Sequence, residues 1–475
     1  MKSSTVRLWL TLCVGGLLAP LAPNLAQAQT RCTDDLNGNR AATSSKAAKG
    51  GALAPRPAGE PSQAEPPLDP LSQLQVIARE ASRRSHAVGA ARLLAEAARA
   101  DVEEAQAGYW PTVGVSASFG GGSTEVDGRV TSQGKQAAVN LSVSAPVWDN
   151  GRVRQMTDYR EKLASVARYG AAITSETVVL EAVTAALERN RYRLQAQVYQ
   201  QYMRKMSCLV EALEGIVAED RGRASELIQA RKTQAQTELQ RDQALAQSRQ
   251  IEIRLRRLIG DNVLPGDGIT IPLASVPEIG EINRQIEMSN EARQLRTQAE
   301  AMESYTRAVV AGQRPQLNWN LGRSQGTQGG AAVASWQAGV TVSYSLFNGF
   351  SDAAAQQAAM KRAEAARRQL DELLTGKFAR TAEMYDTASS AFDRARRYVD
   401  VLRDSEKVRN FTFQQWSQLG RRSLFDVMSS ESDHFNLRIA YVNALHDGYL
   451  ASAQLRSLGN GLSQWLVPEM VQLTQ

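Results

Sequence analysis

The chain contains the same series of landmarks twice. Three features recur in order: a proline that opens an alternating stretch, a glycine that closes a second one, and a glycine that ends a long helical run. The pairs are Pro111 and Pro315, Gly151 and Gly349, and Gly260 and Gly459, with offsets of 204, 198 and 199 residues. A nearly constant offset indicates a duplicated structural unit. Each unit is expected to contain a helix, two strands and a long helical hairpin.

Two long proline-free segments lie in these units: no proline occurs between Pro146 and Pro265, nor between Pro315 and Pro468. Proline removes a helix hydrogen bond and clashes with the preceding turn, so its absence permits very long helices. We predict helices over 153–220 and 351–419, turns near Gly222 and Gly420, and returning helices to 259 and 458. Helices over 71–107 and 281–311 are predicted to precede the strands.

The long helix of the second unit carries apolar residues at heptad spacing. One row contains Ala363, Leu370, Met384, Ala391 and Tyr398, interrupted by Lys377, and the second contains Leu374, Ala388, Ala395 and Leu402. Heptad spacing is typical of a coiled coil, and the alanines permit close approach of neighbouring helices. Taken alone, the helices fit an elongated coiled-coil or adaptor protein equally well.

Four stretches alternate apolar and uncharged polar residues, over 112–119, 137–147, 315–321 and 335–347. About 10 residues of such alternation is typical of a membrane-spanning β-strand. A soluble half-buried sheet alternates in the same way, but the lack of charge on both faces favours the membrane. The residues predicted to face lipid are Val113, Val115, Val139, Leu141, Val143, Leu317, Trp319, Trp336, Val340, Val342 and Tyr344. Segments 120–134 and 324–332 are Gly-rich and polar, and we expect them to form surface loops.

The four strands of one chain are too few for a barrel, and an open sheet edge is not tolerated in lipid. The chain is therefore expected to associate with copies of itself. Three copies would supply twelve strands, enough for a barrel with an aqueous channel. The expected fold is dominated by α-helices and internally duplicated, with four β-strands and long coiled-coil hairpins in each chain.

The N-terminus has the features of a secretory signal peptide over residues 1–28. Lys2 and Arg7 precede the apolar run 8–18, and Ala26 and Ala28 fit a cleavage site. Residues 29–70 are rich in Pro and Ala and are expected to form a flexible leader. The first repeat is assigned to 71–260, a linker to 261–280, the second repeat to 281–460 and a C-terminal tail to 461–475. Removal of the signal peptide lowers the net charge from +6 to +4. The sequence contains no basic cluster of the kind that would indicate binding to nucleic acid.

Two cysteines remain after that cleavage, Cys32 and Cys208, and the sequence leaves open whether they pair. The residues before Cys32 lack a lipoprotein pattern, which disfavours a lipid anchor. No motif for catalysis, a cofactor or a metal is present, and His434 and His446 are interpreted as ordinary residues of helix surfaces. The sequence predicts neither an enzyme nor a bound cofactor.

From about residue 71 to 460, the chain resembles the TolC family of outer-membrane efflux and secretion channels. The resemblance is carried by the strand-to-helix corners 147–151 and 346–349, the hairpin turns 222–225 and 420–427, and the closing glycines of both repeats. It implies a homotrimer in the outer membrane, with a twelve-stranded β-barrel that continues into a periplasmic α-helical barrel. It also implies two partners, a periplasmic adaptor protein and an inner-membrane pump that is either an ABC exporter or a proton-driven pump.

The resemblance assigns roles to the hairpin turns. The adaptor-docking tips are expected at Gly222, Arg223, Ser225, Gly420, Arg421 and Ser423. A periplasmic gate is expected at Arg422 and Asp426, with Ser429 where the family often has a second acidic residue. Because Arg422 and Asp426 lie four residues apart, we expect them to share one face of the returning helix.

Two classes of function remain. The first is a passive exit channel of a three-component export system. Type I protein secretion is favoured there by the missing lipid-anchor cysteine, with multidrug or small-molecule efflux as the alternative. The second class is a coiled-coil structural protein of the envelope that forms no channel.

Overall fold

The computed structural model of the chain describes residues 69–126, 129–261, 269–328, 330–418 and 421–469. The expected signal peptide, nearly all of the expected leader, Cys32 and Gly420 lie outside these residues. Within them, the chain forms two compact units. We call residues 192–248 and 396–442 the hairpin-end unit, and residues 69–191, 249–395 and 443–469 the sheet unit.

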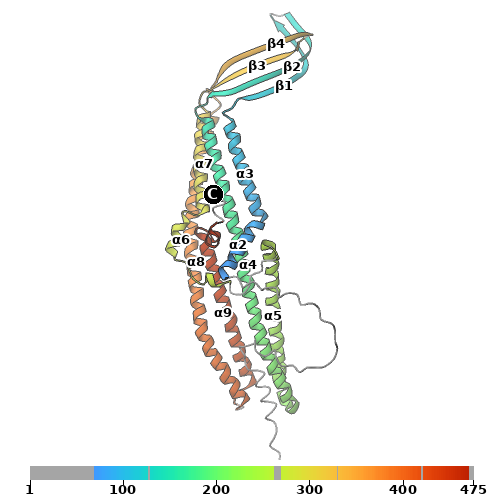
Figure 1. The fold of residues 1–475 in the computed structure, drawn as a ribbon, viewed down its shortest axis with the longest axis vertical. Coiled ribbons are helices and arrows are strands. Elements are labelled where there is room, and N and C mark those ends of the chain that lie inside the picture. Colours follow the sequence, from blue (N-terminus) through green and yellow to red (C-terminus); the bar gives the residue numbers. More distant parts are fainter. Residues whose placement is uncertain (1–68, 127–128, 262–268, 329, 419–420, 470–475) are drawn as a thin grey trace, which may run out of the picture. The chain divides into compact units, whose positions relative to one another are not determined.

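The sheet unit contains four antiparallel strands, adjacent in the order β1-β2-β3-β4 (Figure 1). Their bounds are β1 Thr112–Val126, β2 Arg129–Trp148, β3 Gln316–Gln328 and β4 Ala331–Ser343. The expectation of surface loops over 120–134 and 324–332 is therefore wrong for most of both segments. Strand pairing uses backbone groups, so Gly-rich polar sequence can continue a ladder that carries no apolar alternation. β4 also ends earlier than predicted, so Tyr344 and Phe347 follow the strand.

The long helices match the prediction closely. They are α4 Arg152–Glu219, α5 Ala224–Ile259, α8 Ser351–Ser417 and α9 Leu424–Leu458. The shorter elements are the 3-10 helices η1 Arg221–Arg223 and η2 Ile271–Leu273 and the α-helix α10 Leu462–Leu466. Both strand-to-helix corners contain consecutive residues of positive φ, Asn150 and Gly151 in one and Gly349 and Phe350 in the other. The shared backbone geometry of these corners agrees with the duplication seen in the sequence.

The helices before the strands are each broken in two, where the sequence predicted one continuous helix. They are α2 Pro70–Arg84 followed by α3 His86–Ala107, and α6 Ile279–Ile286 followed by α7 Asn290–Gly312. A serine caps the second helix at each break: Ser85 Oγ accepts a hydrogen bond from Val88 N at 3.3 Å, and Ser289 Oγ accepts one from Ala292 N at 3.4 Å. Serine side chains stabilise helix N-termini in this way, and both breaks occur at such a residue.

The predicted heptad rows of α8 are buried or half-buried, with Ala388 and Ala391 at 0% exposure. Lys377 interrupts one row and is also buried. Its ammonium forms an ion pair with Glu291 and donates to Leu458 O at 3.3 Å. These partners explain how a cation is accommodated within an apolar row.

One segment of α4 is apolar enough to cross a membrane by its composition. This 18-residue window has a mean hydropathy of 1.3 and is half buried inside the protein.

Candidate functional site

The strand register places the predicted lipid-facing residues together on one face of the sheet. Val113 lies opposite Val143, Val115 opposite Leu141, and Ala117 opposite Val139. Leu317 lies opposite Val342, Trp319 opposite Val340, and Arg323 opposite Trp336. Directly opposed residues project to the same face. Tyr344 is the exception, because it lies beyond the end of β4. Trp336 is 77% exposed, so the face has no cover from its own chain at that point.

The other face of the sheet is polar and is linked by hydrogen bonds between strands. The Thr112 hydroxyl donates to Ser144 O at 3.0 Å, and Asn140 Nδ2 donates to Ser116 Oγ at 3.4 Å. Between β3 and β4, the Thr341 hydroxyl donates to Asn320 Oδ1 at 3.5 Å. The sheet therefore has one apolar and one hydrogen-bonding face, which is the pattern of a strand between lipid and a water-filled lumen.

Arg323 extends the apolar row of β3, although it lies beyond the alternating stretch of the sequence. It lies opposite Leu141 on one side and Trp336 on the other. The next residues of the same row, Gln325 and Thr327, are also polar. On β3 the apolar part of the face is thus limited to Leu317–Leu321. The place of Arg323 in this row follows from the end of β3 at Gln328, which the alternating pattern of the sequence does not indicate.

The hairpin-end unit has a hydrophobic core to which α4, α5 and α9 all contribute. Met206 and Leu213 from α4, Ala230 from α5, and Leu424 and Val427 from α9 are each fully buried. The ring of Tyr202 stacks on Phe435 with centroids 4.7 Å apart, and burial raises the pKa of its phenol. Both hairpins are therefore joined by one core close to their turns.

The first predicted tip is a short turn held by local hydrogen bonds. Gly222 N donates to Asp220 Oδ1 at 2.9 Å, and Arg223 Nη2 pairs with Glu226 Oε2 at 2.7 Å. Gly222 and Ser225 are exposed. Gly222 lies outside the left-handed region, so this turn does not depend on positive φ.

The second turn contains a capping box in addition to the predicted ion pair. Ser423 N donates to Asp426 Oδ2 at 3.1 Å, and Asp426 N donates to Ser423 Oγ at 3.3 Å. These reciprocal bonds satisfy two backbone donors at the start of α9. Arg422 precedes that helix, so the expectation that both residues lie on one helix face is wrong. Its Nη1 is 4.0 Å from Asp426 Oδ2. Arg421, Arg422, Ser423 and Ser429 are exposed.

A buried cluster of three charges, which was not among the predicted site residues, lies in the same unit. Glu431 of α9 is 3.7 Å from Lys205 Nζ of α4 and 3.7 Å from Arg409 Nη1 of α8. Their side chains are 1%, 10% and 5% exposed respectively. The signal was present in the sequence, because Glu431 continues the apolar row of Leu424, Met428 and Phe435 on α9. A carboxylate in such a row requires a buried cationic partner.

The interpretation of two histidines as surface residues is also wrong. His434 is 7% and His446 is 2% exposed. His446 Nε2 lies 3.4 Å from Asn190 Nδ2, and His434 Nδ1 lies 3.3 Å from Ser405 Oγ. Both residues pack between helices. Contacts between helices that are distant in the chain cannot be predicted from local sequence spacing. In the part of the chain that the structure describes, no group of three or more His, Cys, Asp or Glu residues could hold a metal ion.

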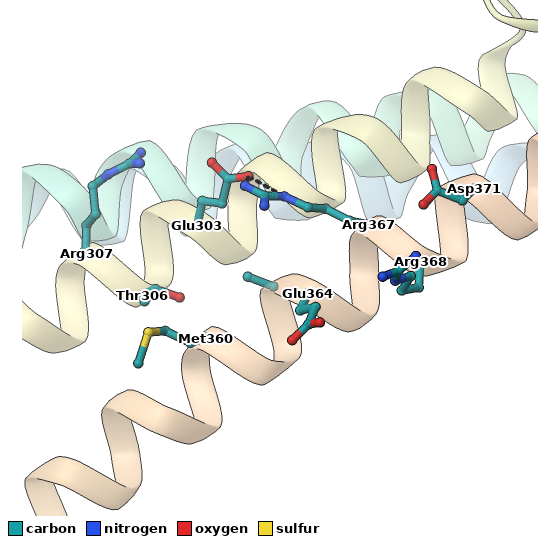
Figure 2. Close-up of a pocket in the computed structure, with 9 residues that line it drawn as sticks. Glu303, Thr306, Arg307, Met360, Glu364, Arg367, Arg368 and Asp371 are labelled. Carbon is teal, nitrogen blue, oxygen red and sulfur yellow. Dashed lines mark hydrogen bonds and ion pairs between the residues drawn. The ribbon is translucent and has the colours of Figure 1, made fainter.

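An open groove of about 620 Å³ lies between α7 and α8 in the sheet unit (Figure 2). Its charged lining residues are Glu303, Arg307, Glu364, Arg367, Arg368 and Asp371. Arg367 Nη2 pairs with Glu303 Oε1 at 2.5 Å between the two helices. With equal numbers of acidic and basic side chains, the groove has no strong preference for either an anion or a cation.

Comparison with known proteins agrees with this architecture. Residues 77–261 match the sequence model of a family described as outer membrane efflux protein. No curated protein matches the sequence. A membrane protein from Pseudomonas aeruginosa shares the fold with a TM-score of 0.74 and 17% identity, covering 83% of this chain and 92% of its own.

Two further solved structures show the same relationship. The outer membrane protein VceC from Vibrio cholerae has a TM-score of 0.70 at 17% identity, covering 82% of this chain and 97% of its own. The CmeC outer membrane channel of Campylobacter jejuni has a TM-score of 0.71 at 13% identity, covering 86% and 89%. The family match over residues 77–261 and the fold shared over most of the chain agree with the resemblance to the TolC family of outer-membrane channels.

Proposed function

We propose that the chain forms a homotrimeric channel of the outer membrane, the passive exit duct of a three-component export system. The observation that carries this proposal is the open four-stranded sheet. β1 and β4 each have one neighbour, and the sheet has one apolar and one polar face. An open edge is not tolerated in lipid, and three such sheets supply a twelve-stranded barrel with a polar lumen.

The apolar face defines the part of the sheet that we place in the membrane. A membrane strand needs about 9–11 residues, whereas β1 has 15 and β2 has 20. The apolar row is richest in the half of the sheet next to the helices, from Val113 to Ala117 on β1. The Arg323 guanidinium can reach water at the membrane surface while its stem stays apolar. The remaining parts of the strands then extend beyond the lipid on the outer side.

We place the helices in the periplasm and the hairpin turns at the adaptor protein. Gly222, Arg223, Ser225, Arg421 and Ser423 are exposed or partly exposed, and the core directly behind them holds the two turns together. Rigid exposed turns suit docking, because little conformational entropy is lost on binding. The pump of the inner membrane, an ABC exporter or a proton-driven transporter, then delivers cargo through that adaptor.

We retain the gate at Arg422 and Asp426 as part of this proposal, with Ser429 leaving a single acidic position per chain. Three Asp426 carboxylates near a threefold axis would repel one another, and Arg422 is the nearby cation. The expected result is a higher conductance in a planar bilayer for Arg422→Ala than for the unmodified channel. Arg421→Ala is the matched control. Equal conductance of all three proteins would refute the gate.

For the cargo, we propose protein secretion by a type I system, on the basis of the missing lipoprotein pattern before Cys32. The family description, efflux, supports small molecules as the second candidate. A strain that lacks the gene for this chain distinguishes the two candidate cargoes. Loss of a secreted protein supports the first, and greater sensitivity to toxic compounds with normal secretion supports the second.

The architecture is tested by mass and by conductance. We expect a trimer in detergent and ion-conducting channels in a planar bilayer. A stable monomer in detergent would refute the barrel, and a water-soluble species without conductance would favour a structural coiled-coil protein.

A further inference from the structure

We propose that the strand-to-helix corners bind anionic phospholipids at the membrane surface that faces the periplasm. Three exposed arginines, Arg152, Arg154 and Arg314, hold the negatively charged headgroups. This binding rests on the proposed function, because it requires the sheet to lie in the membrane and the helices to lie in the periplasm. It adds a preferred class of lipid to that placement.

The corners lie at one end of the sheet, where α3, α4, α7 and α8 join the strands (Figure 1). β1 and β3 begin there, and β2 and β4 end there, as the pairs Thr112–Ser144 and Gln316–Ser343 show. Asn150 Nδ2 donates to Pro315 O at 2.6 Å and so joins two of the connections. We call the connecting residues the corner belt, and they comprise 108–111, 147–154, 312–315 and 344–352.

Six aromatic side chains of the corner belt are exposed. They are Tyr109, Trp110, Trp148, Tyr344, Phe347 and Phe350. Trp110 is 73% exposed, and Trp148 lies opposite Leu317 at the end of the apolar face. Amphipathic aromatic rings are enriched at the level of the lipid headgroups. The corner belt therefore fits the headgroup level on the side of the helices.

The three arginines of the corner belt have no partner in their own chain. Within the residues that the structure describes, the side chains of Arg152, Arg154 and Arg314 form neither an ion pair nor a hydrogen bond. Farther along α4, by contrast, Arg160 Nη1 lies 3.8 Å from Asp101 Oδ2. The guanidinium groups of the corner belt are therefore available to a ligand outside the chain.

These guanidinium groups lie around the first corner and do not converge on one point. Arg152 and Arg154 project to opposite sides of α4, because residues two apart in a helix differ by about 200°. Arg152 Cδ lies toward α7, where it would be 3.3 Å from a Cβ at Gly312, and Arg314 follows that glycine by two residues. Arg154 is close enough to the Tyr109 phenol to interact with it electrostatically. This spread suits a layer of headgroups better than a single soluble anion.

The acidic residues of the corner belt do not neutralise the arginines. The belt contains two, Asp149 and Asp352, and neither forms an ion pair within the described ranges. Asp149 accepts hydrogen bonds from Gly151 N at 2.9 Å and Val153 N at 2.7 Å, so it caps the start of α4. Asp352 lies in the first turn of α8, where the helix dipole favours a carboxylate. Three arginines against two acidic residues leave the belt positive.

Exposed aromatic rings beside unpaired guanidinium groups fit a molecule that has an apolar part and a negative headgroup. A guanidinium can bind a phosphate through two parallel hydrogen bonds, and arginines near an anionic membrane surface strengthen binding to it. Phosphatidylcholine also has a phosphate, but its own choline cation offsets that charge. The corner belt is therefore expected to prefer phosphatidylglycerol, which has no such cation.

Fluorescence quenching by brominated lipids measures this preference in the assembled channel. The protein is reconstituted in phosphatidylcholine vesicles that contain a small share of brominated phosphatidylglycerol, or the same share of brominated phosphatidylcholine. Trp148 and Trp319 lie on the apolar face near the corner belt, so bromine beside them quenches their emission. Stronger quenching by brominated phosphatidylglycerol is expected at low salt. NaCl should reduce the difference, because it screens exposed charges.

The test variant replaces Arg152, Arg154 and Arg314 together by Gln. An arginine near an anionic surface contributes up to about fivefold in affinity, so this variant should lose most of the preference for phosphatidylglycerol. A second variant replaces the same three residues by Lys. It retains their charge and should retain most of the preference.

The control replaces by Gln three exposed arginines that lie far from the sheet, Arg204, Arg249 and Arg254. Arg204 lies 52 residues after the start of α4, which is about 78 Å along that helix. The other two flank Glu252 of α5, whose partner Arg189 lies 37 residues after the start of α4, or about 56 Å along it. The control should keep the preference of the unmodified channel.

Mass in detergent and conductance, measured for every variant, separate the two proposals. A conducting trimer that shows no preference for phosphatidylglycerol, or whose Gln variant keeps it, overturns this inference and leaves the proposed function standing. The same holds if the Lys variant or the control loses the preference as fully as the test variant does. Loss of the preference on adding inorganic phosphate at constant ionic strength would assign the arginines to a soluble anion and also overturn it. A monomer without conductance overturns the proposed function itself.

Discussion

The buried charge cluster of the hairpin-end unit allows a sharp test of what holds the two hairpins together. Glu431 lies 3.7 Å from each of two cations, Lys205 and Arg409, which belong to different helices. Lys205 Nζ also lies 5.1 Å from the centroid of the Phe413 ring, so its surroundings are largely apolar. We predict that Glu431→Gln destabilises this unit far more than removal of an exposed charge does.

The size of the destabilisation expected for Glu431→Gln follows from the burial of the three charges. In a medium of effective dielectric 20, two unit charges 3.7 Å apart attract by about 4.5 kcal/mol, and desolvation offsets much of that attraction. Removing the carboxylate leaves two cations buried without it, and breaking one buried pair costs about 3–5 kcal/mol. Glu406 is the matched control, because it approaches the same Arg409 at 3.9 Å but is 52% exposed. Glu406→Gln should cost at most about 1 kcal/mol.

The assay is thermal unfolding in detergent, followed by helical circular dichroism at one fixed scan rate, because unfolding of such a protein can be irreversible. The Glu431→Gln midpoint should fall well below that of Glu406→Gln. Replacing Lys205, Arg409 and Glu431 together by Met should recover much of the loss, since apolar residues can substitute for a buried ionic cluster. Equal midpoints for Glu431→Gln and Glu406→Gln would refute the reasoning.

Three further predictions concern the sheet, the second turn and acid stability. Val340→Arg, opposite Trp319 on the apolar face, should cost about 2–4 kcal/mol and reduce trimer yield, while Thr341→Arg on the polar face should be better tolerated; equal yields would contradict the assigned faces. Ser423→Ala removes the cap of α9 and should cost about 0.5–2 kcal/mol by thermal unfolding, and Ser429→Ala, the exposed control, should be neutral. Burial alone would raise the pKa of Glu252, but hydrogen bonds from Arg189 and Arg256 outweigh it and hold that pKa below its usual value. Glu252→Gln should therefore be less stable than the unmodified chain at neutral pH. The difference should shrink as the pH falls below about 4.5 and vanish below the lowered pKa of the folded state; a difference independent of pH would refute the pairing.

Much of the architecture could be predicted from the sequence, because its physical causes are local. The proline-free segments permit the long helices, and heptad spacing identifies the rows that α8 buries, including Ala388 and Ala391. Alternation over ten residues identifies the strands and the residues that share a face. The nearly constant offset between repeats then gives the order of all these elements without any knowledge of their contacts.

The ends of the elements could not be predicted in the same way. The strands continue through Gly-rich polar sequence, because a ladder needs only backbone partners. For the same reason, the place of Arg323 on the apolar face became visible only with the register. The helix breaks at Ser85 and Ser289 depend on serine caps, which heptad spacing does not report.

The partners of charged residues are the other feature that only the tertiary structure decided. From the sequence, Arg422 and Asp426 are an i, i+4 pair on a helix. In the structure, Asp426 caps α9 together with Ser423, and Arg422 lies before the helix. The place of Glu431 in an apolar row of α9 indicates that it is buried, but only the structure identifies its two cationic partners, which come from different helices. Periodic spacing determines which side of an element is apolar, whereas the partner of a buried charge is set by residues distant in the chain. The sequence alone therefore determined the repeated helices and strands, and the tertiary structure decided which charges join them.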